Sequence, residues 1–430
     1  MTIAATKQEN STLANLESPA RHMARVKVAY IMSAFPALTE TFILYEILAM
    51  QKLGIAIQLY PLRRLKEDVV HPEVAQISGQ VHHRPFISPA IVRAQLHFVG
   101  QRPLAYFKVL FEVLKGTFGS ANFFFGAAAI FPKAVLFAYE MEKQKINHVH
   151  AHFATHPAVA ALIVHRLTGI PFSFTAHGSD LHVERRMLDR KVEAAAFAVT
   201  ISSFNKEIMV KECGEQARGK IHIVHCGVDP DEFPYPTVRK NRDRFQIVCV
   251  AAFKDVKGHT YLVEACRILQ ERGVDFACHL VGEGELRSKI EEQIAQVGLQ
   301  NKVILHGARP RSEIVSMLAQ SDVLALASVP TPRGKREGIP VVLMEGMASG
   351  LPVVASRLSG IPELVEDGRS GFLVPPGDSL ALADALQRLR DNSHLRQQMG
   401  QAGRDKVTRE FNLMTNAARR ATLYENGILV

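Results

Sequence analysis

Two series of short apolar runs, each separated by helical segments, follow one another along this chain of 430 residues. The runs of the first series lie at 26–32, 57–62, 148–152, 171–175 and 198–201. Those of the second series lie at 247–252, 277–281, 303–306, 323–327, 353–355 and 371–374. Runs of this length that alternate with helices are typical of parallel strands covered by helices on both faces. We therefore predict an α/β fold with two consecutive open sheets, in which ligands bind at the carboxyl ends of the strands.

A break that is rich in proline and charge separates the two series. Pro230, Pro234 and Pro236 precede the charged run 239–244, and this composition is typical of an interdomain linker. We divide the chain into a flexible leader, a first domain, a linker, a second domain and a C-terminal helix, at residues 1–24, 25–236, 237–244, 245–400 and 401–430.

The composition indicates a globular cytoplasmic protein, with 47% apolar and 22% charged residues. Five scattered cysteines lack the spacing of a metal or redox motif and predict reduced thiols. The polar N-terminus predicts no secretory signal. The longest apolar run, Phe123–Phe131, is ended by Pro132 and Lys133, and a membrane span needs about 20 such residues. We therefore expect no transmembrane helix.

Residues 91–142 form a stretch of different character, in which large apolar residues recur at helical spacing. These residues are Phe107, Leu110, Phe111, Leu114 and Phe118, with Lys108, Glu112 and Lys115 between them. The pattern has two interpretations: a helix packed on the first domain, or an amphipathic surface that contacts a membrane or a lipid-linked substrate. The net charge of +9 favours anionic partners without choosing among phosphate ligands, lipid headgroups and nucleic acid.

The most informative stretch is 337–355, EGIPVVLMEGMASGLPVVA, which predicts a loop, a helix, a turn and a strand. Pro340 suits the first helical position and Gly350 suits the helix C-terminus. The N-terminus of such a helix offers unpaired N–H groups and a positive dipole end to a phosphate. Glu345 lies roughly 7.5 Å further along the helix axis, which is about the separation of a pyrophosphate from its ribose hydroxyls. Glu345 could therefore hold a ribose, while Glu337 meets the group beyond the phosphates.

This stretch resembles the Glu-x7-Glu motif of retaining glycosyltransferase family 4. The similarity extends from about Val26 to the C-terminal helix, and 226–229 (CGVD), 359–363 (SGIPE) and 371–374 (GFLV) resemble further family landmarks. The first loop, 35–42 (FPALTETF), is similar to that of the exopolysaccharide and colanic acid branch. The resemblance implies a GT-B fold, in which two facing Rossmann-like domains enclose a cleft.

In that fold the first domain binds the acceptor and the second binds the nucleotide sugar, and the C-terminal helix returns to the first domain. The resemblance also implies three catalytic residues. Glu337 contacts the donor sugar near the reacting carbon, Lys257 of KDVKGH contacts the diphosphate, and His177 of TAHGSD faces the donor sugar from the first domain. The other residues expected to bind the donor are Glu345, Gly338, Ile339, Val341, Val342, Arg309 and Lys254.

One departure from the family concerns the phosphate site. Many relatives have Gly-Arg ahead of the lysine, whereas this chain has Ala251-Ala252. The charge of the phosphates must then be met by Lys257, by Lys254 or Arg309, and by the helix N-terminus. We expect no cofactor and no metal. An Asp-x-Asp clamp in a strand context is missing, and the pair 150 and 152, both histidines, has no evident third ligand.

The predicted function is the retaining transfer of a sugar from a nucleoside diphosphate to an acceptor hydroxyl. The expected acceptor is a glycan or a lipid-linked oligosaccharide of exopolysaccharide or cell-envelope synthesis, reached in the cytoplasm with peripheral contact at the inner membrane face. The alternatives are a sugar-nucleotide epimerase or phosphorylase of the same fold, or a non-catalytic glycan- or nucleotide-binding protein. Nucleic-acid binding is disfavoured, because the positive charge is dispersed and no recognition motif accompanies it.

Overall fold

The computed structural model describes residues 26–36, 41–65, 73–235 and 244–428. The predicted leader, 1–24, and residues 237–243 of the predicted linker lie outside these ranges. The chain forms two compact units. Unit 1 holds the described residues up to Thr200, Lys206–Val224 and the residues from Ala417 onward, whereas unit 2 holds Ile201–Asn205 and His225–Asn416.

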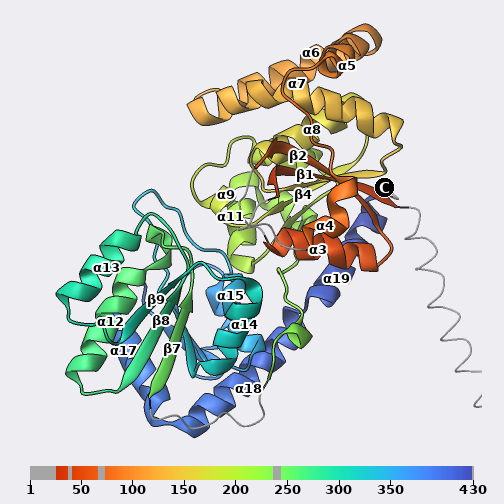
Figure 1. Cartoon of the computed structure of the whole chain (residues 1–430). Helices are drawn as coiled ribbons and strands as arrows, with labels where there is room; N and C mark the ends of the chain where they lie inside the picture. Colours follow the sequence, from red (N-terminus) through yellow and green to blue (C-terminus); the bar gives the residue numbers. More distant parts are fainter. Residues whose placement is uncertain (1–25, 37–40, 66–72, 236–243, 429–430) are drawn as a thin grey trace, which may run out of the picture. The chain divides into compact units, whose positions relative to one another are not determined.

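Unit 1 is built on a six-stranded sheet with the order β2-β1-β3-β4-β5-β6 (Figure 1). Its strands are β1 (Lys27–Phe35), β2 (Ala56–Arg64), β3 (His148–His152), β4 (Phe172–Ala176), β5 (Phe197–Thr200) and β6 (Ile221–Ile223). All neighbouring strands pair in parallel. The predicted α/β class is confirmed, and the apolar runs predicted every strand except β6.

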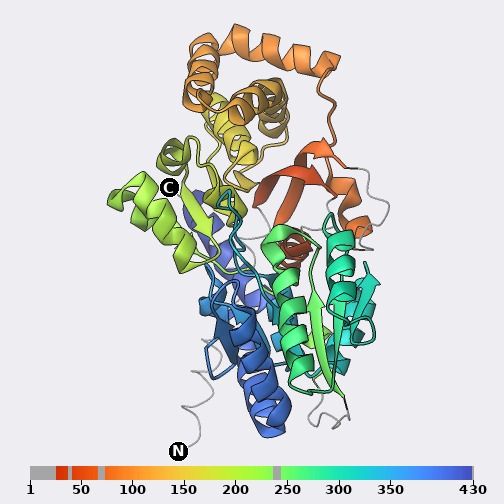
Figure 2. The ribbon, with the colours of Figure 1, turned by 90° about the vertical axis from the view of Figure 1, so that its left-hand side faces the viewer.

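The helices of unit 1 cover both faces of this sheet. They are α3 (Thr41–Lys52), α4 (Val74–Ile77), α5 (Pro89–Gln101), α6 (Pro103–Thr117), α7 (Ala121–Lys143), α8 (His156–Thr168), α9 (Ser179–His182), α10 (Leu188–Ala194) and α11 (Ser203–Cys213). Figure 2 shows α5, α6 and α7, in orange, grouped beyond the yellow helix α8. The last helix, α19 (Leu413–Ile428), begins in unit 2 and ends in unit 1.

Helix α7 is longer than the apolar run Phe123–Phe131, from whose length no membrane span was expected. The helix continues through Pro132 for eleven further residues, because contacts with α5 and α8 compensate for the hydrogen bond that the proline cannot make. Lys133 is buried and its Nζ donates to the carbonyl oxygen of Leu62 over 2.7 Å. Among the described residues α7 is the one helix that is long and apolar enough to cross a membrane, and 56% of its apolar window is buried in the fold. Burial of this extent is typical of a core helix.

Helix α6 settles how the amphipathic stretch packs within unit 1. The helix contacts α7 and α8, but its buried side chains are those of Val109, Val113 and Thr117. Phe107 and Phe111, which the helical spacing assigned to the apolar face, are 56% and 66% exposed. The prediction of a helix packed on the first domain is therefore correct. The face that this helix buries is not the one that carries Phe107 and Phe111.

Unit 2 has a second parallel sheet, with the order β12-β11-β10-β7-β8-β9. Its strands are β7 (Phe245–Val250), β8 (Phe276–Val281), β9 (Val303–Gly307), β10 (Val323–Leu326), β11 (Val353–Ser356) and β12 (Gly371–Val374). Its helices are α12 (His259–Glu271), α13 (Arg287–Gln296), α14 (Arg311–Gln320), α15 (Val341–Ala348), α16 (Ile361–Leu364), α17 (Ser379–Asp391) and α18 (Ser393–Glu410). The order places β7 and β10 side by side, so the loops that follow these two strands meet at one edge of the sheet.

The buried histidines of unit 1 predict a loss of stability in mild acid. Burial lowers the pKa of His148 to about 3 and holds the pKa values of His150 and His177 well below their ordinary value. Below pH 6.5 the unfolded chain therefore binds protons that the folded chain does not, and the free energy of unfolding falls as the pH falls. At pH 5 the loss is about 2 kcal/mol for each histidine.

Urea unfolding followed by circular dichroism at pH 7.5 and pH 5 measures this loss, since the chain has no tryptophan. The carboxyl of Glu46, with a pKa of about 2, contributes little, because glutamates are still mostly ionised in the unfolded chain at pH 5. His148→Phe should reduce the difference between the two pH values, and His394→Gln, at an exposed position of α18, should not. If the wild type and both variants lost the same free energy of unfolding between pH 7.5 and pH 5, His148 would not account for the loss.

Candidate functional site

The loop between β10 and α15 carries the first glutamate of the motif. Helix α15 begins at Val341, one residue later than predicted, because Pro340 has an extended ψ of 125° and serves as the N-cap. The carbonyl oxygen of Pro340 accepts a hydrogen bond from the N–H of Leu343 over 3.1 Å. The amides of Val341 and Val342 have no partner within the helix, since the first turn of any helix leaves its N–H groups unpaired.

Glu337 and Lys257 lie together in unit 2. The Nζ of Lys257 is 3.0 Å from Oε1 of Glu337, and the two side chains are 21% and 15% exposed. Lys257 follows β7 and Glu337 follows β10, which are neighbouring strands. The structure thus brings two of the three residues predicted as catalytic into one ion pair at the carboxyl ends of the strands.

Gly258 makes this meeting of the two loops possible. Its φ is +67°, and a Cβ at this position would lie 1.8 Å from the carbonyl oxygen of Ala327. Only glycine has no Cβ, so only glycine allows the loop after β7 to approach the loop after β10 this closely. The N-terminus of α12 begins directly after Gly258, at His259.

Glu345 lies on α15 and forms an ion pair that the sequence did not predict. Its Oε1 accepts a hydrogen bond from Arg311 over 2.9 Å, and the second terminal nitrogen of Arg311 donates to Glu232 over 2.6 Å. Burial raises the pKa of Glu345, and Arg311 counteracts this. Arg311 begins α14, two residues after the predicted Arg309. The carboxylate is therefore already in place at an arginine, with 14% of the side chain exposed.

Arg309 and Lys254 do not join these groups. The Nε of Arg309 donates to the carbonyl oxygen of His306, and its guanidinium pairs with Glu313 at 3.2 Å on the surface. Lys254 is exposed, at the start of the turn that leads to Lys257. Within the described ranges neither side chain shares a hydrogen bond or ion pair with Lys257, Glu337 or Glu345. Their predicted role in binding the phosphates stays a prediction.

Ala251-Ala252, which stand where many relatives have Gly-Arg, take part in a tight backbone contact. Gly282 and Gly284 follow β8 with φ values of +147° and +159°. A Cβ on Gly282 would lie 2.1 Å from the carbonyl oxygen of Ala251, and one on Gly284 would lie 2.5 Å from that of Phe253. These two glycines therefore serve the packing of the loop that leads to Lys257.

His177 belongs to unit 1 and follows β4. It is buried, and its Nε2 lies 3.1 Å from Nδ1 of His152, with the two rings stacked at 5.4 Å. Asp180 fixes the loop, because one carboxylate oxygen accepts from the N–H groups of His177 and Gly178 and the other accepts from that of Ala154. Burial holds the pKa of His177 well below its ordinary value, so the imidazole is neutral at pH 7.

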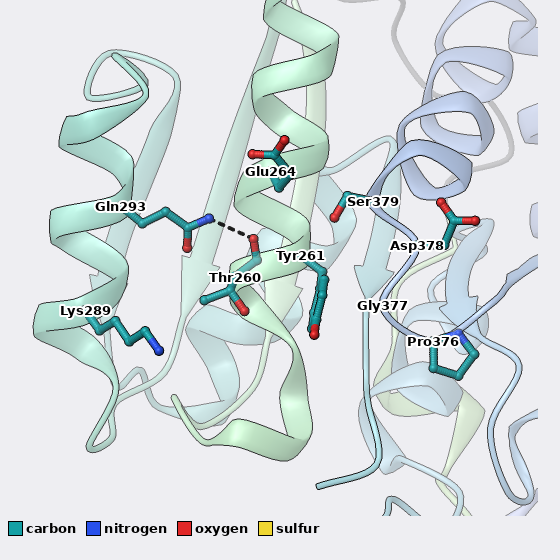
Figure 3. A pocket seen from close by; sticks show the side chains of 9 residues that line it. All are labelled: Thr260, Tyr261, Glu264, Lys289, Gln293, Pro376, Gly377, Asp378 and Ser379. Atoms are coloured by element: carbon teal, nitrogen blue, oxygen red, sulfur yellow. Dashed lines mark hydrogen bonds between the residues drawn. The ribbon is translucent and has the colours of Figure 1, made fainter. Parts of the chain in front are cut away.

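A separate pocket lies elsewhere in unit 2 (Figure 3). It has a volume of about 750 Å³, and its lining residues come from α12, α13 and the start of α17. Within it the amide of Gln293 donates to the carbonyl oxygen of Thr260 over 2.9 Å. None of the predicted site residues lines this pocket.

Two family profiles match the chain. Residues 105–232 match the profile described as Glycosyltransferase Family 4, and residues 236–406 match that described as Glycosyl transferases group 1. The two matches together take in well over half of the chain. The chain belongs to glycosyltransferase family 4. The predicted resemblance is thereby confirmed.

Curated relatives of this family 4 member match part of its length. It is 40% identical over 193 residues to the amylovoran biosynthesis glycosyltransferase AmsK of Erwinia amylovora, which is 45% of this chain and 47% of AmsK. It is also 40% identical over 197 residues to WcaL of Escherichia coli K12, a proposed colanic acid biosynthesis glycosyltransferase, which is 45% of this chain and 48% of WcaL. The chain therefore matches about half the length of each of these relatives.

Solved structures share the fold of this family 4 member. A glycosyltransferase of Rickettsia africae has a TM-score of 0.70 and 19% identity, over 94% of this chain and 99% of that one. HepE of Anabaena in complex with UDP has a TM-score of 0.66 and 16% identity, over 93% of this chain and 100% of that one. These likenesses confirm the GT-B fold that the resemblance implied.

Four residues that the sequence did not predict lie against the predicted site residues. Arg311 contacts Glu345, and Asp180 fixes the loop of His177. His152 contacts His177, and Glu46 contacts His152. The short segment Arg309-Pro310-Arg311 contains two arginines, and its sequence does not show which of them contacts Glu345. Asp180 could have been found as a side chain three residues after His177, at the spacing of a helix N-terminus.

Proposed function

We propose that this protein is a retaining glycosyltransferase that moves a sugar from a nucleoside diphosphate to an acceptor hydroxyl. The observation that carries the proposal is the Lys257–Glu337 ion pair, at the carboxyl ends of neighbouring parallel strands. Helix α15 begins four residues after Glu337, directly past Pro340. A cation, a carboxylate and unpaired helix amides within one loop region suit a donor that has both an anionic leaving group and a sugar.

In this mechanism Lys257 and the amides of Val341 and Val342 stabilise the diphosphate as the sugar departs. Charge on the leaving oxygens develops in the transition state, and fixed donors that face it lower the barrier. Removal of one such donor typically costs about 3 kcal/mol, or a hundredfold in rate. Before the donor binds, Glu337 neutralises Lys257. The incoming phosphates can take over the lysine and leave the Glu337 carboxylate for the sugar.

Glu345 has a separate role in the proposed mechanism, the binding of the ribose. A carboxylate can accept hydrogen bonds from two hydroxyl groups at once. Arg311 occupies Oε1 of Glu345 and holds the side chain in place. The position on α15, beyond the amino end that faces the phosphates, fits the separation of a ribose from its diphosphate.

The proposed acceptor is a growing glycan of exopolysaccharide synthesis. AmsK acts in amylovoran biosynthesis by its name, and WcaL is assigned to colanic acid biosynthesis, which supports this class for the present chain. A lipid-linked oligosaccharide would be reached at a membrane surface. The side chains of Leu104, Phe111 and Phe125, on α6 and α7, are 87%, 66% and 70% exposed and support such contact.

The proposed function is tested by nucleotide-sugar turnover. We expect a panel that includes UDP-glucose and GDP-mannose to contain one compound that raises the Tm, because a ligand at about 100 times its Kd stabilises a protein by about 2.7 kcal/mol. The same compound should release its nucleoside diphosphate when an acceptor glycan is added. Stabilisation without release of the diphosphate would favour a binding protein, and an epimerised nucleotide sugar would favour an epimerase.

Membrane contact is tested by flotation with vesicles that contain phosphatidylglycerol. We expect the protein to float at low salt, because exposed apolar side chains lie beside the exposed Lys108 and Lys115. The double variant Leu104→Glu/Phe111→Glu should stay in the soluble fraction. Leu380→Glu replaces a residue of unit 2 that is 54% exposed and should float like the wild type. Equal flotation of all three proteins would count against this surface.

A further inference from the structure

A buried cluster of polar residues in unit 1 connects the last helix to the sheet. Arg420 of α19 is 3% exposed, and its Nε lies 3.2 Å from Oε1 of Glu46 on α3. The terminal nitrogen of Arg420 donates to Oγ1 of Thr175 on β4 over 2.6 Å, and the hydroxyl of Tyr30 donates to Oε1 of Glu46 over 2.9 Å. Burial alone would raise the pKa of Glu46, but Arg420, His152 and Tyr30 hold it at about 2. The carboxyl is therefore an acceptor at every ordinary pH.

Three residues of this cluster have the composition of a metal site. Ligand atoms of Glu46, His150 and His152 lie within 4.8 Å of one another. However, Arg420 already stands among them, with one nitrogen 3.3 Å from Nε2 of His150 and another 3.2 Å from the Glu46 carboxylate. A guanidinium at this place supplies the positive charge that a cation would bring.

His152 lies between the Glu46 carboxylate and His177. Its Nε2 is 3.5 Å from Oε1 of Glu46, and its Nδ1 is 3.1 Å from Nε2 of His177. Nδ1 of His177 is buried and has no hydrogen-bond partner among the described residues. A continuous series of contacts thus leads from Arg420 through Glu46 and His152 to Nε2 of His177. At the end of this series, Nδ1 of His177 has no hydrogen-bond partner within the described residues.

The chemistry of these groups determines where each ring proton lies. An ionised carboxylate can only accept, so the His152 nitrogen that faces it is favoured as the N–H. With the proton of His152 on Nε2, its Nδ1 is the acceptor in the 3.1 Å contact with Nε2 of His177. The facing Nε2 of His177 consequently carries the proton. Nδ1 of His177 is left with a lone pair, ready to accept a hydrogen bond.

We propose that Glu46 and Arg420 are positioning residues, which through His152 fix the proton of His177 on Nε2 and make its Nδ1 a hydrogen-bond acceptor for the donor sugar. The inference rests on the proposed function and on the expectation, stated with the family resemblance, that His177 faces the donor sugar and its hydroxyl groups. A hydroxyl donates to an imidazole nitrogen only if that nitrogen is unprotonated. Control of the tautomer therefore decides whether the histidine accepts the sugar hydroxyl.

The tautomer can be measured without substrate or activity. Protein labelled with ¹⁵N-histidine at pH 7.5 should show His177 with its proton on Nε2, the signal being identified by its loss in His177→Gln. The double variant Glu46→Leu/Arg420→Met removes both charges together, which spares the fold an unpaired buried ion. In this variant the His177 proton should divide between the two nitrogens. His152→Phe, which keeps the ring but removes the acceptor, should do the same.

Kinetics then test whether the tautomer matters for transfer. We expect kcat, with the nucleotide sugar that the wild type turns over, to fall about 10- to 100-fold in both variants, as for other groups that orient a histidine. Affinity for UDP should not change, because the predicted nucleotide residues belong to unit 2. Tyr424→Phe is the matched control. Tyr424 lies one turn from Arg420 on the buried face of α19, and its hydroxyl donates to that of Tyr30, which donates to Glu46; the variant keeps the ring and both charges of the Glu46–Arg420 pair.

Several results would overturn the proposal. A His177 proton on Nδ1 in the wild type, or a His152 protonated on both nitrogens, would contradict the proposed proton positions before any variant is made. A changed tautomer with unchanged kcat would remove its role in transfer. An equal loss of kcat in Tyr424→Phe would indicate that the packing of α19 is what matters. If the wild type turns over no nucleotide sugar, the proposed function fails, and the spectra still decide the tautomer.

Discussion

Replacement of Glu337 by glutamine is expected to lower turnover by at least about a hundredfold and to leave the fold intact. The sugar carbon gains positive charge as its bond to the diphosphate breaks, and a carboxylate beside it stabilises that charge. Glutamine has nearly the same shape but lacks the charge. Because Glu337 is a loop residue with a part-exposed ion pair, loss of that pair should change stability by only about 1 kcal/mol.

Release of nucleoside diphosphate, measured beside the Tm, checks this expectation. Glu292→Gln is the control, since Glu292 is an exposed glutamate of α13 in the same unit and lies outside the predicted site. Turnover by Glu337→Gln close to that of the wild type would remove Glu337 from the mechanism. A large fall in Tm would instead assign the residue a structural role.

Lys257→Met should have the second largest effect, a loss of about a hundredfold in kcat/KM together with weaker UDP binding. The methionine keeps the length of the side chain but cannot meet the charge of the phosphates. Since Lys254 and Arg309 do not lie with the Lys257–Glu337 pair, neither is placed to compensate. The variant also frees Glu337, whose charge then repels the diphosphate.

Calorimetric titration with UDP measures the binding part of this loss. Lys289→Met removes a lysine of α13 that lines the separate pocket of Figure 3, and it should bind UDP as the wild type does. If Lys257→Met binds UDP with unchanged affinity, the lysine does not contact the phosphates. If Lys289→Met is the weaker binder, the separate pocket is the nucleotide site.

Hydrophobic patterning predicted most of the fold because parallel strands covered on both faces are nearly continuous apolar runs. The short strand β6 was not predicted, because Ile221–Ile223 has only three residues and a histidine at its centre. The full length of helix α7 was not predicted, for another reason. Local rules end a helix at Pro132, yet the contacts of its other side chains with α8 outweigh the one missing hydrogen bond.

The candidate site was predictable only as far as its motifs extend. Spacing along the chain placed Glu345 on α15, but it could not tell whether Arg309 or Arg311 turns toward that glutamate, because the direction depends on the loop after β9. The contact of Arg420 with Thr175 joins residues 245 positions apart. No local pattern relates such residues, so only the assembled unit shows them together.

Gly258 has a consequence for how variation in this protein should be interpreted. The residue has no functional group, yet any side chain there would displace the backbone that delivers Lys257. A mutational survey scored by activity should therefore rank position 258 with the charged residues, although its contribution is only the absence of atoms. Tolerance to substitution would then report how closely two loops touch, and it would not by itself identify the groups that perform the chemistry.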